Sequence, residues 1–155
     1  MEVSVVEMPE VTVLGTRRKG RYEEIGSMIM DVCRYAGQKG MPVQGPPAFV
    51  CHENTPEEAR KANTAGTADV EIVVPVGRKT RGHGAIKCYT LTGGRMARIV
   101  HEGPYKDVGG AYIRLFAWVG ENKLRISGPI REVYPNEPGK VPEDKLLTEI
   151  YAPVA

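Results

Sequence analysis

The sequence predicts an α+β fold built by duplication of a β-α-β-β unit, with an antiparallel sheet, two main helices and a central ligand cleft. The first observation behind this prediction is an internal repeat, since KGRYEEIG at residues 19–26 is similar to EGPYKDVG at residues 102–109. A glycine-proline pair at residues 45–46 recurs at residues 128–129, with the same offset of 83 residues. The second observation is that each copy carries strand, helix, strand and strand patterns in that order. Two such units bury their faces when paired about a pseudo-twofold axis, which leaves a cleft where they meet.

In the first copy, runs rich in β-branched and apolar residues predict strands at residues 11–16, 48–51 and 70–76. A helix is predicted between the first two strands because apolar residues recur there every three to four positions. These residues are Ile25, Ile29, Val32 and Ala36.

The second copy repeats this order. Strands are predicted at residues 95–101, 130–134 and 147–154. The helical face of this copy consists of Val108, Tyr112, Leu115, Phe116 and Val119. We therefore expect a single domain over residues 1–155, made of repeats at about 1–77 and 78–155, with GRKTRGHG at residues 77–84 as a hydrated linker.

A short helix is predicted to begin at Thr55, where Thr-Pro-Glu-Glu combines an N-cap, a proline in the first turn and a capping box. The segment at residues 141–144 is its counterpart in the second copy. Beyond these segments the offset between the copies falls from 83 to 78 residues, so the first copy carries five additional residues, which we place near residues 62–68.

Composition excludes several classes of protein. The chain has 155 residues, 41% of them hydrophobic, which favours one globular domain over disorder. Lys and Arg number 21 against 19 Asp and Glu, so no basic face for nucleic acid is expected. Cys33, Cys51 and Cys88 form no CxxC pair and are interpreted as reduced thiols. No secretion signal or membrane-spanning stretch is recognisable, and we expect a soluble cytoplasmic protein without a membrane partner.

No motif for a cofactor or a metal ion is present. The chain lacks a P-loop, a dinucleotide fingerprint, HExxH and GxSxG, and we expect no cofactor. His52, His83 and His101 lack the spacing of a zinc site, so no metal is expected.

Acidic residues inside predicted strands are the candidate site residues. Glu149 lies in the apolar segment LLTEIYAPV, and a charged residue is rarely buried unless it is paired or functional. Alternation places Tyr151 on the same strand face as Glu149, and Tyr134 on the same face as Glu132. If the strands share one sheet, both pairs line one side of the cleft.

Aromatic residues and one further acid complete the predicted site. We expect Trp118 and Tyr112 on the second helix to add aromatic walls. In the first copy, Phe49 aligns with Glu132 and Glu71 aligns with Glu149. The first copy is therefore predicted to supply an apolar wall and the second copy the polarity. Whether Glu71 faces the cleft is left open, and its loss is expected to cost less binding than the loss of Glu149.

The order of these motifs resembles the GyrI-like small-molecule-binding domain, the effector-binding module of multidrug-responsive and AraC-type regulators, here in a free-standing form. The resemblance rests on the repeated helix starts, the GPP and GPI turns, and REVYPNEP followed by VPEDKLLTEIYAPV. It implies a groove for bulky aromatic and cationic molecules, anchored by a strand glutamate at Glu149, with Tyr151 and Glu132 nearby. No helix-turn-helix precedes the domain, so direct DNA binding is not expected.

Three functions remain open from this resemblance. The leading hypothesis is binding of a hydrophobic or cationic small molecule. An alternative is a hydrolase that opens cyclopropane-bearing electrophiles, with Glu149 and Tyr151 as catalytic residues. The third is a gyrase-modulating factor that acts through an unidentified protein partner. The motifs do not decide whether the chain is an enzyme.

Overall fold

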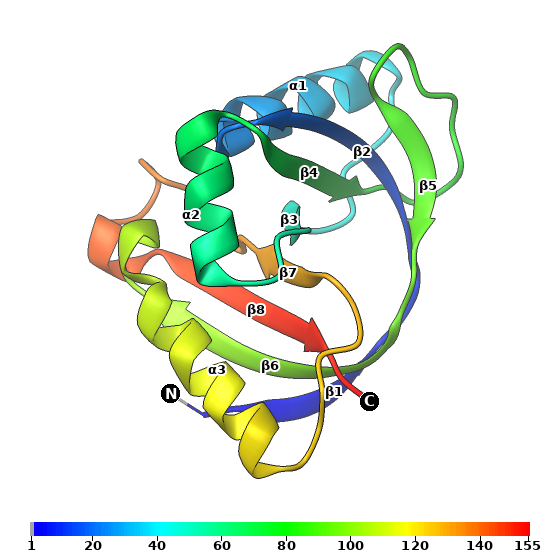
Figure 1. Ribbon diagram of the computed structural model, residues 1–155. Coiled ribbons are helices and arrows are strands. Elements are labelled where there is room, and N and C mark those ends of the chain that lie inside the picture. Colours follow the sequence, from blue (N-terminus) through cyan, green and yellow to red (C-terminus); the bar gives the residue numbers. More distant parts are fainter. Residues whose placement is uncertain (1) are drawn as a thin grey trace. The chain divides into compact units, whose positions relative to one another are not determined.

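The computed structural model describes residues 2–155, which form two compact units (Figure 1). The N-terminal unit comprises residues 10–92, and the C-terminal unit comprises residues 2–9 together with residues 93–155. The mixed composition of helices and antiparallel strands confirms the predicted α+β class.

The N-terminal unit contains four antiparallel strands in the order β3-β4-β2-β5. Their bounds are β2 (Val11–Gly20), β3 (Ala48–Cys51), β4 (Ala68–Pro75) and β5 (Lys87–Leu91). The predicted strands at 11–16, 48–51 and 70–76 correspond to β2, β3 and β4. The sequence did not predict β5, which follows a loop that includes the basic segment at residues 77–84. This loop therefore lies within the N-terminal unit and joins β4 to β5.

Helix α1 (Ile25–Gln38) contacts β2 and β4 and buries Met28, Val32, Tyr35 and Ala36. A 3-10 turn, η1 (Tyr22–Glu24), leads into it. The Glu24 carboxylate accepts a hydrogen bond from the backbone N–H of Arg21 at 2.7 Å, which satisfies one of the free donors at the start of the turn. The predicted amphipathic helix is therefore present, with its buried face shifted toward Met28 and Tyr35.

Helix α2 (Pro56–Ala65) begins where the capping motif predicted it. The Thr55 hydroxyl accepts a hydrogen bond from the backbone N–H of Glu58 at 3.0 Å, and Gly66 ends the helix at a φ of 72°. No residue of α2 is fully buried, although the helix contacts β4, so its caps define where it begins and ends.

The C-terminal unit contains four antiparallel strands in the order β1-β6-β8-β7. Their bounds are β1 (Ser4–Met8), β6 (Gly94–Glu102), β7 (Ile130–Val133) and β8 (Leu147–Pro153). Helix α3 (Gly109–Glu121) packs on this sheet, preceded by η2 (Tyr105–Asp107), and a third 3-10 turn, η3 (Glu143–Lys145), precedes β8. The core under α3 is made of Ala97, Ile99, Ala111, Leu115, Val119, Ile150, Ala152 and Val154.

Both units contain strand, helix, strand and strand in the predicted order, and each has one strand more than predicted. The additional strand is β5 in the N-terminal unit and β1 in the C-terminal unit. The compact units divide at residues 9–10 and 92–93 rather than near residue 77. The five additional residues of the first copy correspond to α2, whose place is taken by the shorter η3 in the C-terminal unit. No helix within residues 2–155 is long and apolar enough to cross a membrane.

Candidate functional site

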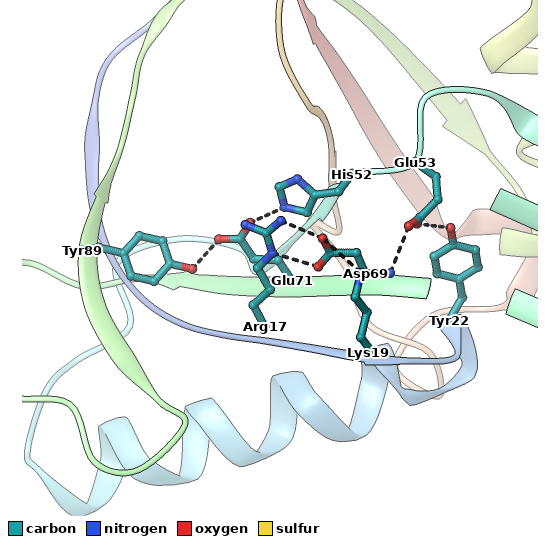
Figure 2. Close-up of polar contacts among 8 residues, drawn as sticks. All are labelled: Arg17, Lys19, Tyr22, His52, Glu53, Asp69, Glu71 and Tyr89. Carbon is teal, nitrogen blue, oxygen red and sulfur yellow. Dashed lines mark hydrogen bonds and ion pairs between the residues drawn. The ribbon is translucent and has the colours of Figure 1, made fainter. Parts of the chain in front are cut away.

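Glu71, on β4, is an acidic residue that is only 8% exposed. His52 Nε2 lies 2.7 Å from one carboxylate oxygen, and the Tyr89 hydroxyl donates to the other oxygen at 2.5 Å. Figure 2 shows the three side chains converging from β4, from the end of β3 and from β5. The N-terminal unit therefore contains a buried carboxylate held by an imidazole and a phenol.

Strand register explains this convergence. Val50 of β3 is directly opposite Glu71, and His52 follows Val50 by two residues, so His52 returns to the Glu71 side of the sheet. Tyr89 lies on β5, which is separated from β4 by β2. Its ring reaches Glu71 by crossing Gly15 of β2, where an added Cβ would stand 2.2 Å from the Tyr89 hydroxyl oxygen. A glycine at position 15 is thus required for this contact.

Burial and the neighbouring Glu71 carboxylate raise the pKa of the Tyr89 phenol far above its usual range. The phenol therefore stays protonated and remains a hydrogen-bond donor at neutral pH.

An ion pair lies beside this cluster. Arg17 binds both carboxylate oxygens of Asp69 at 2.8 and 2.7 Å, and Lys19 Nζ lies 3.9 Å from Asp69 (Figure 2). The hydrogen bonds from Arg17 hold the pKa of Asp69 below its usual range, and in turn those bonds to Asp69 raise the pKa of Arg17. Both cations are thus engaged with Asp69.

Glu53 extends the polar network toward the start of α1. Its carboxylate accepts hydrogen bonds from the Tyr22 hydroxyl and, at 3.0 Å, from the backbone N–H of Asp69. Figure 2 shows Arg17, Asp69 and Glu71 on the side of β2 and β4 that faces away from α1, with Tyr22 beyond the end of β4.

Glu149 and Tyr151 lie on one face of β8, as predicted. The Tyr151 hydroxyl donates to Glu149 at 3.0 Å and accepts from Arg98 Nε at 3.1 Å. Arg98 of β6 also forms an ion pair with Glu149 at 3.1 Å. Burial raises the pKa of the Tyr151 phenol, and the hydrogen bond to Tyr151 raises the pKa of Arg98. The Glu149 carboxylate therefore already has a permanent cation as its partner.

Glu132 and Tyr134 also act together, but on the other face of the sheet. Glu132 is directly opposite Ile150, which belongs to the core under α3, so it shares the face of Ile150 rather than that of Glu149. Its carboxylate accepts hydrogen bonds from the Tyr112 and Tyr134 hydroxyls, the latter at 3.0 Å. The expectation that both carboxylates line one side is therefore wrong. The sequence shows which residues share a face within one strand but not the register between strands.

Burial raises the pKa of Glu132, and the two phenol hydrogen bonds only partly offset this effect.

Trp118 packs against the core under α3. In the N-terminal unit, Phe49 is directly opposite Ile72, so it points away from the face that carries Glu71, and its ring meets the Tyr22 ring edge-on at 5.6 Å. Trp118 and Phe49 thus both lie in packing contacts.

Within residues 2–155, no group of three or more His, Cys, Asp and Glu side chains is arranged to hold a metal ion.

The comparison with protein families identifies the chain. Residues 1–155 match the family described as the GyrI-like small molecule binding domain. The chain belongs to the GyrI-like family. No curated protein sequence matches this GyrI-like chain.

Solved structures with the same fold include EcmrR and a hydrolase. The cryo-EM complex of EcmrR with DNA has a TM-score of 0.85 at 21% identity, and the alignment covers 99% of this chain. This GyrI-like chain spans 57% of the length of that EcmrR chain. The crystal structure of the EcmrR C-terminal domain has a TM-score of 0.80 at 22% identity, with 99% of this chain and 97% of that chain covered.

Two further structures are more distant. A hydrolase from Listeria innocua has a TM-score of 0.71 at 14% identity, covering 99% of this chain and 92% of that chain. SAV2435 bound to tetraphenylphosphonium has a TM-score of 0.60 at 14% identity, covering 100% of this chain and 94% of that chain. At these identities the likenesses show a common fold.

Sequence reasoning missed most partners of the acidic residues. His52 was not predicted as a site residue, and Tyr89 lies on a strand that was not predicted. Arg17 and Arg98 carried no motif, because their roles depend on which residues stand beside them across neighbouring strands. The run Lys-Cys-Tyr-Thr-Leu at residues 87–91 is the one local signal for β5 that the sequence offered.

Proposed function

We propose that this GyrI-like domain binds small molecules that combine aromatic surface with a positive charge, and that Glu71 supplies the charge complement. The observation that supports this assignment is the environment of Glu71. Its carboxylate is buried, and within residues 2–155 its side-chain hydrogen bonds come from an imidazole and a phenol. Arg17 acts on Glu71 electrostatically but forms its hydrogen bonds with Asp69. A buried carboxylate that is not hydrogen-bonded to a permanent cation is costly, and a bound cation reduces that cost.

The other two predicted anchors are less suitable. Glu149 already forms an ion pair with Arg98, so a ligand cation would compete with a covalently tethered guanidinium. Glu132 has a raised pKa because it is buried, which disfavours the negative charge that a cation requires. The ion pair of Glu149 with Arg98 therefore favours Glu71 over Glu149 as the anchor of a cationic ligand. This order is the reverse of the one expected from the sequence.

Tyr89 adds an aromatic surface beside the carboxylate. A ring next to a carboxylate suits a delocalised cation, because the ring face attracts positive charge while the carboxylate balances the loss of hydration. The Tyr89 phenol donates to Glu71, so its ring is held against the same carboxylate.

The test compares a cationic and a neutral aryl compound of similar size, tetraphenylphosphonium and triphenylphosphine oxide, by isothermal titration calorimetry. Glu71→Gln should weaken tetraphenylphosphonium binding by about tenfold or more, equivalent to about 1.4 kcal/mol, and leave the neutral compound nearly unaffected. Glu149→Gln is the matched control on β8 and should have a smaller effect. Equal losses for both compounds, a larger loss in Glu149→Gln, or no tetraphenylphosphonium binding would contradict the proposal.

A second candidate function is hydrolysis of a strained electrophile, favoured by the contacts of Tyr151. This phenol donates to Glu149 while Arg98 donates to it, so a carboxylate, a phenol and a cation are in direct contact. Glu149 would take a proton from water, whose oxygen bonds to a cyclopropane carbon. The ring C–C bond breaks, its electron pair moves to a conjugated carbonyl oxygen, and Tyr151 protonates that oxygen. Mass spectrometry would detect the water adduct, and equal product from Tyr151→Phe would exclude this role.

A further inference from the structure

His52 occupies a position between the acidic groups of the N-terminal unit. Its Nε2 atom is 2.7 Å from Glu71, and its side chain is 18% exposed. Its charge also contributes to the lowered pKa of Asp69, although less than the hydrogen bonds from Arg17 do. His52 is thus placed to change the charge that surrounds Glu71.

The charges around His52 do not balance when its ring is neutral. Three carboxylates, those of Glu53, Asp69 and Glu71, share the network with two permanent cations, Arg17 and Lys19. Both cations pair with Asp69. One negative charge therefore remains when His52 is neutral, and none remains when it is protonated.

We infer that His52 determines the ligand class of the proposed site by competing with the ligand for Glu71. A protonated His52 neutralises Glu71 and disfavours a cationic ligand. A neutral His52 leaves the carboxylate charge for the ligand, while neutral aromatic compounds bind similarly in both states. This inference rests on the proposed function, since it concerns the charge available at the same carboxylate.

Three groups around His52 keep their charge states across the pH range in which histidine side chains change charge. Histidine side chains titrate between about pH 5 and 8. Asp69 on β4 has a lowered pKa, whereas Arg17 on β2 and Tyr89 on β5 have raised pKa values, so all three keep their charge states across this range. Glu71 is the acid that contacts the His52 ring. Glu53 is the next residue after His52, but its carboxylate is bound by Tyr22 and by the backbone of Asp69. Binding of a cation should therefore release a proton from His52.

The coupling between cation binding and proton release limits how steeply the affinity can change with pH. One linked proton changes the affinity by at most about tenfold per pH unit. The affinity for a cation should accordingly rise from pH 5 to pH 8, and the affinity for a neutral compound should stay nearly constant. Salt screening alone would not produce this difference, because ionic strength is held constant across the series.

The experiment measures tetraphenylphosphonium and triphenylphosphine oxide affinities between pH 5 and 8 for the wild-type chain, His52→Gln and His83→Gln. His83 is a matched control, because it lies on an exposed loop, where its ring stacks on Tyr35. Calorimetry near pH 6 in phosphate and in Bis-Tris, which differ in ionisation enthalpy, gives the number of protons released. His52→Lys adds a permanent cation and should weaken tetraphenylphosphonium binding at every pH.

The inference predicts a pH-dependent affinity for the cation in the wild type and in His83→Gln, and a flat profile in His52→Gln. A pH dependence that survives in His52→Gln would overturn it, as would tetraphenylphosphonium binding without proton release. Failure of the proposed function gives a different result, since tetraphenylphosphonium would then not bind to any variant at any pH. Thermal melts of each variant verify that the fold is intact.

Discussion

Gly15→Ala should test whether the Tyr89 crossing holds the Glu71 cluster together. The new Cβ would stand 2.2 Å from the Tyr89 hydroxyl oxygen and 2.9 Å from the backbone oxygen of Ile72, both inside contact distance. The Tyr89 ring must move away, which removes its hydrogen bond to a buried carboxylate, a loss of about 1.5 to 3 kcal/mol. Overpacking adds about 1 to 3 kcal/mol. We expect a total destabilisation of about 2.5 to 6 kcal/mol, or about 5 to 24 °C in Tm for a chain of this size.

The assay is thermal and urea denaturation of Gly15→Ala, Tyr89→Ala and the double variant. Because Tyr89→Ala removes the obstructing ring, Gly15→Ala should cost markedly less in that background, with a coupling of about 1 kcal/mol or more. Gly26→Ala is the control, since nothing lies within 4 Å of a Cβ at this position in α1, and alanine there should be neutral or stabilising by up to about 1 kcal/mol. Equal Tm changes for Gly15→Ala and Gly26→Ala, or strictly additive costs with Tyr89→Ala, would refute the reasoning.

Two further predictions concern pH and helix capping. Burial raises the folded-state pKa of Glu132, so the wild type should lose stability as pH rises from about 4.3, the usual glutamate pKa, through the raised value. Urea denaturation between pH 4 and 7 should show this slope in the wild type and not in Glu132→Gln. An identical slope in both proteins would count against the assignment. Thr55→Ala removes the N-cap of α2 and should cost about 1 kcal/mol of local stability. Hydrogen exchange of the α2 amides should become faster while Tm stays nearly unchanged, and Thr55→Asp should keep the protection. Unchanged exchange in Thr55→Ala would show that the cap is dispensable.

The predictable part of this fold is the part encoded by local periodicity. Helices α1 and α3 were recognisable because their apolar residues recur at helical spacing, and α2 was recognisable from the capping motif at Thr55. Strands β1 and β5 were missed. Both are five residues long and lie at the edge of their unit's strand order, so they lack the continuous apolar run of β4.

The candidate site was only partly predictable, because its contacts depend on which residues face each other across strands. Alternation along β8 correctly paired Glu149 with Tyr151. It carried no information about Arg98 on β6, nor about the register that places Glu132 on the opposite face. The role of Gly15 illustrates the same limit, since its importance comes from a ring that reaches over it from another strand.

Strand β1 makes the C-terminal unit discontinuous in the chain. Ser4 pairs with Arg98, and all of residues 10–92 lie between the two strands. During synthesis at about 5 to 20 residues per second, β1 emerges several seconds before its partner β6 exists. The N-terminal unit has no such delay, because all four of its strands lie in one continuous segment. The segment that carries the Glu71 cluster can therefore form the pairs among its own four strands on the ribosome, while the first strand of the chain waits for its partner.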